Sequence, residues 1–114
     1  MPNSRRGALQ VQAAYYIATG VWPLMSRRAF ERVTGPKADW WLVQMVGLLA
    51  ASAGVTLAVG ARDERPSAAT RTLGVLCALS FAGIDTVHAL RGRISKIYLA
   101  DALVELVLAA AILR

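Results

Sequence analysis

Charged residues and cysteine are both scarce in this chain of 114 residues. Only 18% of its residues are charged, and no charged residue occurs at positions 7–26 or 40–61. The single cysteine, Cys77, excludes an intramolecular disulfide and a cysteine-based metal site. So little charge is atypical of a soluble domain of this length. Each uncharged stretch is long enough to cross a bilayer, whose hydrocarbon layer needs about 20 helical residues.

Apolar residues make up 56% of the chain, and its mean hydropathy is +0.46. This composition predicts an all-α fold, a four-transmembrane-helix bundle that forms a single membrane domain over residues 1–114. The four helices are expected at about residues 8–25, 39–60, 71–90 and 94–113. Residues 26–34 are expected to form a short interfacial amphipathic helix between the first two, capped by Ser26 and ended by Gly35. No small-residue cleavage site follows the first apolar stretch, so it is expected to be retained as a helix.

The formal charge is +6, and the arginines and lysines gather at the ends of the apolar stretches. Basic residues in such places extend towards lipid headgroups and attract anionic lipids. The sequence therefore predicts membrane lipids, anionic ones included, as partners, and no nucleic acid. Six basic residues fall on the side of the termini and the second loop and seven on the other side, which leaves the membrane orientation open. Such a balance also leaves an antiparallel homo-oligomer open.

Three acidic residues, Asp85, Asp101 and Glu105, interrupt the last two apolar stretches. With a helical rise of about 1.5 Å per residue, the two aspartates lie roughly 9 to 10 Å from the loop that joins those stretches, and Glu105 lies about 16 Å from it. A charged side chain at mid-membrane costs about 2.5 to 3.5 kcal/mol on insertion scales. Acids at this depth are therefore expected to be protonated, paired or hydrated, and they are the first candidates for a functional site.

Helical periodicity indicates that these acids share an interior with polar groups of the other helices. Asp101 and Glu105 are four residues apart, so their carboxyl groups are neighbours on one helix face. Small residues on the same face as Asp85 favour close packing of another helix there. We therefore expect a cavity open towards the first and third loops. The residues expected to bind a ligand in it are Tyr16, Thr19, Gln44, Asp85, His88, Asp101 and Glu105.

A purely structural alternative stays open for the two aspartates. In it, they form ion pairs with basic residues at the ends of the last hairpin, namely Arg91, Arg93 and Lys96. One histidine with three carboxylates lacks a recognised metal-site spacing, so no metal is predicted. No nucleophile motif or phosphate-binding loop is present, so neither a cofactor nor a catalytic residue is predicted.

Three segments carry a resemblance to a known group of proteins. Residues 15–23 (YYIATGVWP), 33–37 (VTGPK) and 97–101 (IYLAD) resemble those of small, uncharacterised bacterial four-helix integral membrane proteins. This resemblance spans nearly the whole chain and implies a multi-pass protein of the bacterial inner membrane. Four short helices around intramembrane acids are also similar, in architecture alone, to the EXPERA-type sterol isomerases and ligand receptors.

Three functions fit this pattern. In the favoured one, the acidic cavity binds or transports a small cationic or amphiphilic molecule. In the second, the chain is a non-catalytic accessory or assembly subunit of a larger membrane complex, and its acids only bond helices together. In the third, it is an isomerase-like membrane enzyme, in which Asp85 or Glu105 moves protons on a lipid-like substrate with His88 as partner. The chain is thus expected to be a binding protein rather than an enzyme.

Overall fold

A computed structural model describes residues 4–114, so the first three residues of the predicted membrane domain lie outside the described part. The described residues form five α-helices and no strand. The helices are α1 (Ser4–Met25), α2 (Arg27–Thr34), α3 (Trp40–Gly60), α4 (Ala68–Leu90) and α5 (Ile97–Leu113). The prediction of an all-α fold is confirmed.

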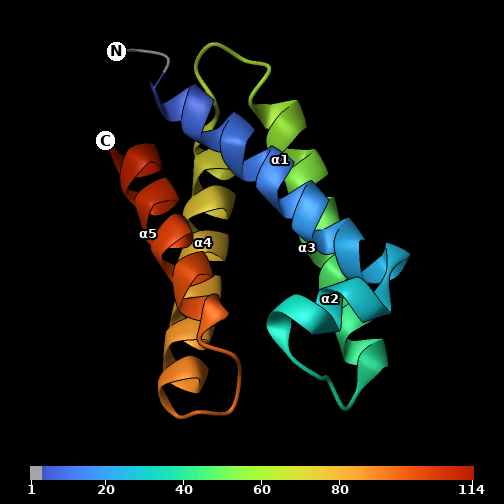
Figure 1. Ribbon diagram of the computed structural model, residues 1–114. Coiled ribbons are helices and arrows are strands. Elements are labelled where there is room, and N and C mark those ends of the chain that lie inside the picture. Colours follow the sequence, from blue (N-terminus) through green and yellow to red (C-terminus); the bar gives the residue numbers. More distant parts are fainter. Residues whose placement is uncertain (1–3) are drawn as a thin grey trace.

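The four long helices form two antiparallel pairs (Figure 1). In one pair α1 packs along α3, and in the other α4 packs along α5. The pairs meet at the end that holds both termini and the loop from α3 to α4, and they diverge towards the opposite end (Figure 1). The short helix α2 lies at this diverging end, where it contacts both α1 and α5. The fold is therefore tightly closed at one end and splayed at the other.

Residues with small side chains bring α1 and α3 close together. A Cβ atom on Gly20 would lie 2.5 Å from the carbonyl oxygen of Gly47, and one on Gly54 would lie 2.8 Å from the carbonyl oxygen of Ala13. Backbones can approach this closely only where a side chain is missing, as at packed helix crossings in membranes. The buried residues of α4 are also small, apart from one acid: Gly74, Ala78, Ala82, Asp85 and Ala89.

The short helix after α1 has the capping residues that the sequence predicts. The Ser26 hydroxyl accepts a hydrogen bond from the backbone N–H of Ala29 at 3.2 Å, which satisfies one of the free N–H groups of the first turn of α2. Gly35 ends α2 with φ at 96°, a conformation that glycine adopts without steric cost. The predicted interfacial segment is therefore confirmed as a helix.

Three of the long helices begin three or four residues away from the approximate starts predicted for them. α4 begins at Ala68, not at residue 71, because the Ser67 hydroxyl accepts the N–H of Thr70 at 3.2 Å and caps the helix earlier. α5 begins at Ile97, not at residue 94, because the turn that contains Gly92, with φ at 74°, extends through Ser95. α1 extends back to Ser4, four residues before its predicted start.

Large apolar side chains lie on the outside of this fold. Twenty-three of them are exposed, whereas most of the buried apolar residues are alanines. Within residues 4–114, α3 and α4 are the helices long and apolar enough to cross a membrane. The lengths and compositions of α3 and α4 thus allow two membrane spans, whereas membrane spans by α1 and α5 stay a prediction.

Candidate functional site

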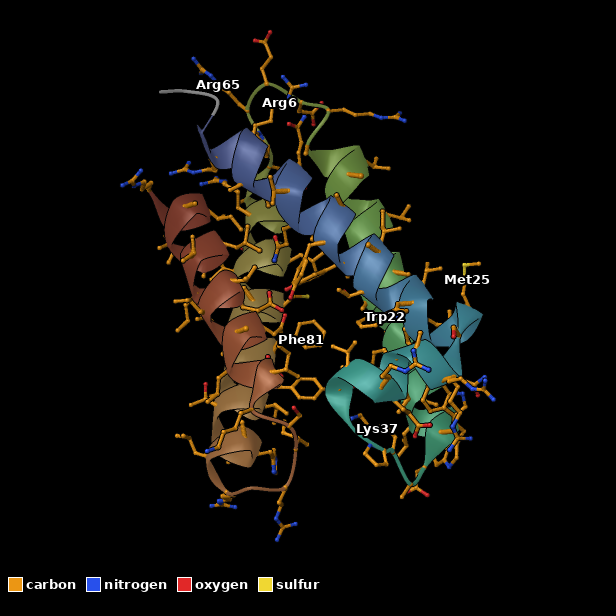
Figure 2. All side chains as sticks on the ribbon, in the orientation of Figure 1. Arg6, Trp22, Met25, Lys37, Arg65 and Phe81 are labelled. Carbon is orange, nitrogen blue, oxygen red and sulfur yellow. The ribbon has the colours of Figure 1, made fainter. Side chains whose placement is uncertain are left out.

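A cavity of about 530 Å³ lies between the two helix pairs, where they diverge. Phe81 projects from α4 into this space, with Trp22 and Lys37 on the side of α1 and α2 (Figure 2). The cavity wall combines aromatic rings with carboxyl groups. Its aromatic residues are Tyr15, Tyr16, Trp22, Phe30, Phe81 and Tyr98, and its acids are Asp85, Asp101 and Glu105.

Glu105 is held by a chain of hydrogen bonds that crosses three helices. The Tyr16 hydroxyl donates to Glu105 Oε1 at 2.7 Å, and Gln12 Nε2 donates to the Tyr16 oxygen at 3.1 Å. Gln12 Nε2 also donates to the backbone carbonyl of Gly74 on α4 at 2.8 Å. The exposed fractions of Gln12, Tyr16 and Glu105 are 0%, 1% and 2%, so water does not compete for these bonds. The chain of bonds therefore fixes one carboxyl oxygen of Glu105 at the inner wall of the cavity.

Asp101 is bound by the adjacent tyrosine of α1. The Tyr15 hydroxyl donates to Asp101 Oδ1, and the backbone carbonyl of Tyr15 accepts a hydrogen bond from the Thr19 hydroxyl at 2.7 Å. Because Tyr15 and Tyr16 are consecutive, one turn of α1 engages both acids of α5. The bonds from Tyr15 to Asp101 and from Tyr16 to Glu105 join α1 to α5 across the gap between the helix pairs.

Asp85 differs from the other two acids because no hydroxyl of the protein donates to its carboxyl group, whose neighbour is the carboxyl group of Asp101. Its side chain lines the cavity and is 5% exposed, and its Oδ2 atom has no hydrogen-bond partner among the described residues. A buried polar atom without a partner costs about 1 to 3 kcal/mol, and more when it is charged. The Oδ2 atom is itself almost fully covered, so Asp85 offers a ligand a carboxyl group at the cavity wall and not an exposed oxygen.

Ion pairing does not explain the two aspartates. Within residues 4–114, the one ion pair is between Arg27 and Glu31, at 3.1 Å, and it lies in α2. No salt bridge joins Asp85 or Asp101 to the basic residues around the last hairpin, so the structural alternative from the sequence is wrong for these side chains. The partner of Asp101 is a tyrosine instead.

The structure gathers five of the seven predicted ligand-binding residues at the cavity. They are Tyr16, Thr19, Asp85, Asp101 and Glu105. Gln44 is exposed and lies outside the cavity, because α3 turns its neighbours Val43 and Gly47 inwards. His88 is half-buried and also lies outside the lining, and it makes no side-chain hydrogen bond to Asp85.

Two further polar residues of the site were not selected from the sequence. Gln12 supports Tyr16, and Tyr15 binds Asp101. Their spacing offered a signal, since Gln12 and Tyr16 are four residues apart on one helix face and Tyr15 adjoins Tyr16. The sequence did not indicate which of two consecutive tyrosines would meet which acid, because both lie near the depth of the acids.

A compact ionic turn at the end of α2 lies beside the cavity, and its Lys37 belongs to the cavity lining. Glu31 Oε2 accepts the backbone N–H of Lys37 at 2.7 Å and its Oε1 accepts Arg27 Nε at 3.1 Å, and these bonds hold the pKa of Glu31 below its usual value. Partial burial lowers the pKa of Lys37. The Lys37 ammonium lies 5.9 Å from the ring centre of Phe30 and 5.2 Å from that of Tyr98.

The chemistry of this wall suits a cation that carries an apolar body. Carboxyl oxygens attract positive charge, and the faces of aromatic rings attract it as well. The chain itself places an ammonium group beside Phe30 and Tyr98, two of the lining rings. The described acids, histidine and cysteine form no cluster of three that would hold a metal ion.

Comparison of the chain with protein-family models, with curated proteins and with solved structures gave no match.

Proposed function

We propose that this chain is an integral membrane protein in which α1, α3, α4 and α5 all cross the bilayer, and that its central cavity binds a small organic cation with an apolar body. The Asp85 carboxyl group carries this proposal, because it is buried, belongs to the cavity wall and receives no hydrogen bond from an N–H or hydroxyl group of the described residues. A multi-pass arrangement in a bacterial inner membrane would place the cavity within the bilayer.

The distribution of apolar residues supports four membrane spans. Leucines and valines cover the outside of α3, α4 and α5, while alanine, glycine and polar side chains fill the inside. In water, so large an exposed apolar surface would be unusual, but in lipid it is the expected outer surface. α5 is the shortest of the four long helices, and its 17 residues give it a length of about 25 Å. Basic residues at both of its ends can extend to the headgroups and compensate for the short span.

The hydrogen bonds around the acids support a division of roles between them. Glu105 and Asp101 are engaged by Tyr16 and Tyr15, so each has given part of its hydrogen-bonding capacity to the protein. Asp85 receives no hydrogen bond from a protein N–H or hydroxyl group. A cation in the cavity would lie beside this carboxyl group and meet the rings of Phe81 and Tyr98, which line the same space.

The lateral gap between helix pairs supports an amphiphilic ligand. α3 and α5 do not pack against each other, and both contribute partly exposed apolar residues to the cavity wall. These are Leu42 and Val46 on α3 and Ile97 and Val104 on α5. In a bilayer this gap would face acyl chains, so the apolar body of a ligand can reach the cavity from the lipid while its charge approaches the acids.

The other two functions receive less support. An assembly subunit needs acids only for bonding helices, which leaves the 530 Å³ space and the Asp85 carboxyl group, to which no protein hydroxyl donates, without a role. An enzyme of the kind considered needs His88 beside Asp85, and His88 lies outside the cavity lining.

Binding of benzyltrimethylammonium, measured by titration calorimetry on the purified protein in detergent, tests this proposal. The quaternary ammonium carries no N–H, so its attraction to the Asp85 carboxylate is electrostatic, about 4 kcal/mol at 4 Å with an effective dielectric constant of about 20. Asp85→Asn should therefore weaken binding by at least about 10-fold. The neutral analogue of the same shape, neopentylbenzene, should bind much more weakly to the wild type.

Asp63→Asn is the matched control, since Asp63 is exposed in the loop between α3 and α4 and lies outside the cavity. It should bind the cation as the wild type does. Equal affinity of Asp85→Asn and wild type, or equal binding of the charged and neutral probes, would contradict the assignment of the cavity to a cation.

A further inference from the structure

A second pocket, of about 260 Å³, lies at the opposite end of the molecule from the splayed mouth. It is formed where the first turns of α1 and α4 meet the last turn of α5. The lining residues are Arg5, Ala68, Arg71, Thr72, Val75, Leu76, Ile112 and Leu113. None of them lines the central cavity, so the two sites are separate.

Two arginines of this pocket have guanidinium atoms that the protein does not satisfy. The Nε atoms of Arg5 and Arg71 are buried, and neither has a hydrogen-bond partner among the described residues. Arg5 uses another nitrogen, Nη2, to reach the backbone carbonyl of Arg114. The adjacent Arg6 differs, because it donates to the carbonyl oxygens of Ala61 and Arg62. Buried N–H donors without a partner thus occur on the two arginines that line the pocket, and not on the adjacent Arg6.

The chemistry of two such donors favours a phosphate group. The planar guanidinium group offers paired N–H donors that match phosphate oxygens, and bonds to a charged acceptor are stronger than those to a neutral one. The first turn of α4, which supplies Ala68, adds the positive end of a helix dipole to the same pocket. The covered Nε atoms do not reach an anion themselves, but the Arg71 side chain makes no hydrogen bond to the described residues, so its terminal nitrogens can donate to one.

The walls of the pocket indicate that the phosphate belongs to a lipid. Beyond Arg71, the next turn of α4 contributes Val75 and Leu76, and α5 contributes Leu113. Leu76 and Leu113 are 58% and 68% exposed, so an apolar surface leads from the arginines along the outside of the helices. A bilayer would place the arginines at headgroup depth and this surface among the acyl chains.

We infer that the Arg5–Arg71 pocket binds the phosphate of an anionic phospholipid, with an acyl chain along Val75, Leu76 and Leu113. This inference depends on membrane insertion but not on what the central cavity binds.

Native mass spectrometry of the protein in detergent, with dioleoylphosphatidylglycerol or dioleoylphosphatidylcholine added, tests the inference. Wild type should retain the anionic lipid at least about tenfold more strongly, given that each basic residue contributes about 1 kcal/mol near an anionic surface. The Arg5→Gln/Arg71→Gln variant should lose this preference. Arg71→Lys should retain part of it, because lysine keeps the charge without the planar fork of donors.

Arg91→Gln/Arg93→Gln is the matched control, since it removes the same charge from the exposed hairpin at the other end. It should keep the preference for phosphatidylglycerol. An equal loss of preference in both double variants would overturn the site, because attraction would then follow net charge alone. Displacement of the lipid by millimolar inorganic phosphate would overturn the lipid assignment in favour of a free-phosphate site. Unchanged benzyltrimethylammonium binding in the Arg5→Gln/Arg71→Gln variant shows that the fold is intact and the two sites are independent.

Discussion

Replacing Gly20 by alanine would place a methyl group between two helices whose backbones already touch. The new Cβ atom would lie 2.5 Å from the carbonyl oxygen of Gly47 and 2.8 Å from the backbone nitrogen of Ala51. Both atoms belong to the backbone of α3, so no side-chain rotation can relieve the overlap. Ordinary contact begins near 3.4 Å, which requires α1 and α3 to separate by about 1 Å at this crossing.

The expected cost follows from two opposing effects. Overpacking of a well-packed interface costs about 1 to 3 kcal/mol, and the better helix propensity of alanine returns up to about 1 kcal/mol. Gly20→Ala should therefore destabilise the fold by about 1 to 2 kcal/mol. Gly83→Ala is the matched control, because a Cβ atom on Gly83 meets nothing within 4 Å. That variant should be neutral or slightly stabilised.

Unfolding by sodium dodecyl sulfate in mixed micelles, followed by circular dichroism, measures this difference. Gly47→Ala should behave like Gly20→Ala, because a Cβ atom on Gly47 would lie 2.6 Å from the carbonyl oxygen of Gly20. The double variant should cost less than the sum of the single variants, since the first methyl group already separates the helices. If Gly20→Ala is as stable as Gly83→Ala, the close crossing of α1 and α3 is not what holds this pair together.

Two further predictions concern the polar contacts. Tyr16→Phe removes the hydroxyl between Gln12 and Glu105 and leaves both buried, so it should lower stability by about 1 to 3 kcal/mol in the same unfolding assay; an unchanged midpoint would exclude an energetic role for this hydrogen-bond chain. Because the pKa of Glu31 is lowered in the folded chain, its contribution to stability should be present above the usual glutamate pKa of about 4.3 and should disappear as the pH falls through the folded value. The stability difference between wild type and Glu31→Gln should thus be measurable at pH 7 and vanish in acid, and a difference that grows in acid would contradict this sign.

The same packing explains both the core and the cavity. Small residues let α1 approach α3, and α4 packs along α5, but the two pairs come closest at the end near the loop from α3 to α4. Towards the other end, large aromatic side chains and carboxyl groups occupy the space between the pairs. The hydrogen bonds from Tyr15 and Tyr16 to the acids of α5 hold the pairs together across this opening.

Local chemistry alone determined several features of this protein. Long uncharged stretches and helical periodicity predicted an all-α fold, and the fold confirms it. Ser26 and Gly35 predicted the limits of the short second helix, because capping depends on a few neighbouring atoms. The starts predicted at about residues 71 and 94 followed the limits of the apolar stretches. In the structure, Ser67 caps α4 before its apolar stretch begins, and α5 begins only at Ile97.

Tertiary structure decided which polar residues meet. A shift of one residue turns a helical side chain by 100°, so depth and spacing placed Asp85, Asp101 and Glu105 near one another without fixing their partners. The orientation of α3 about its own axis turns Gln44 outwards. The orientation of α1 places the Tyr15 hydroxyl against Asp101 and the Tyr16 hydroxyl against Glu105. These rotations depend on contacts between residues far apart in the sequence, such as that of Gly20 with Gly47. For the same reason, only the folded chain shows that one oxygen of Asp85 has no partner.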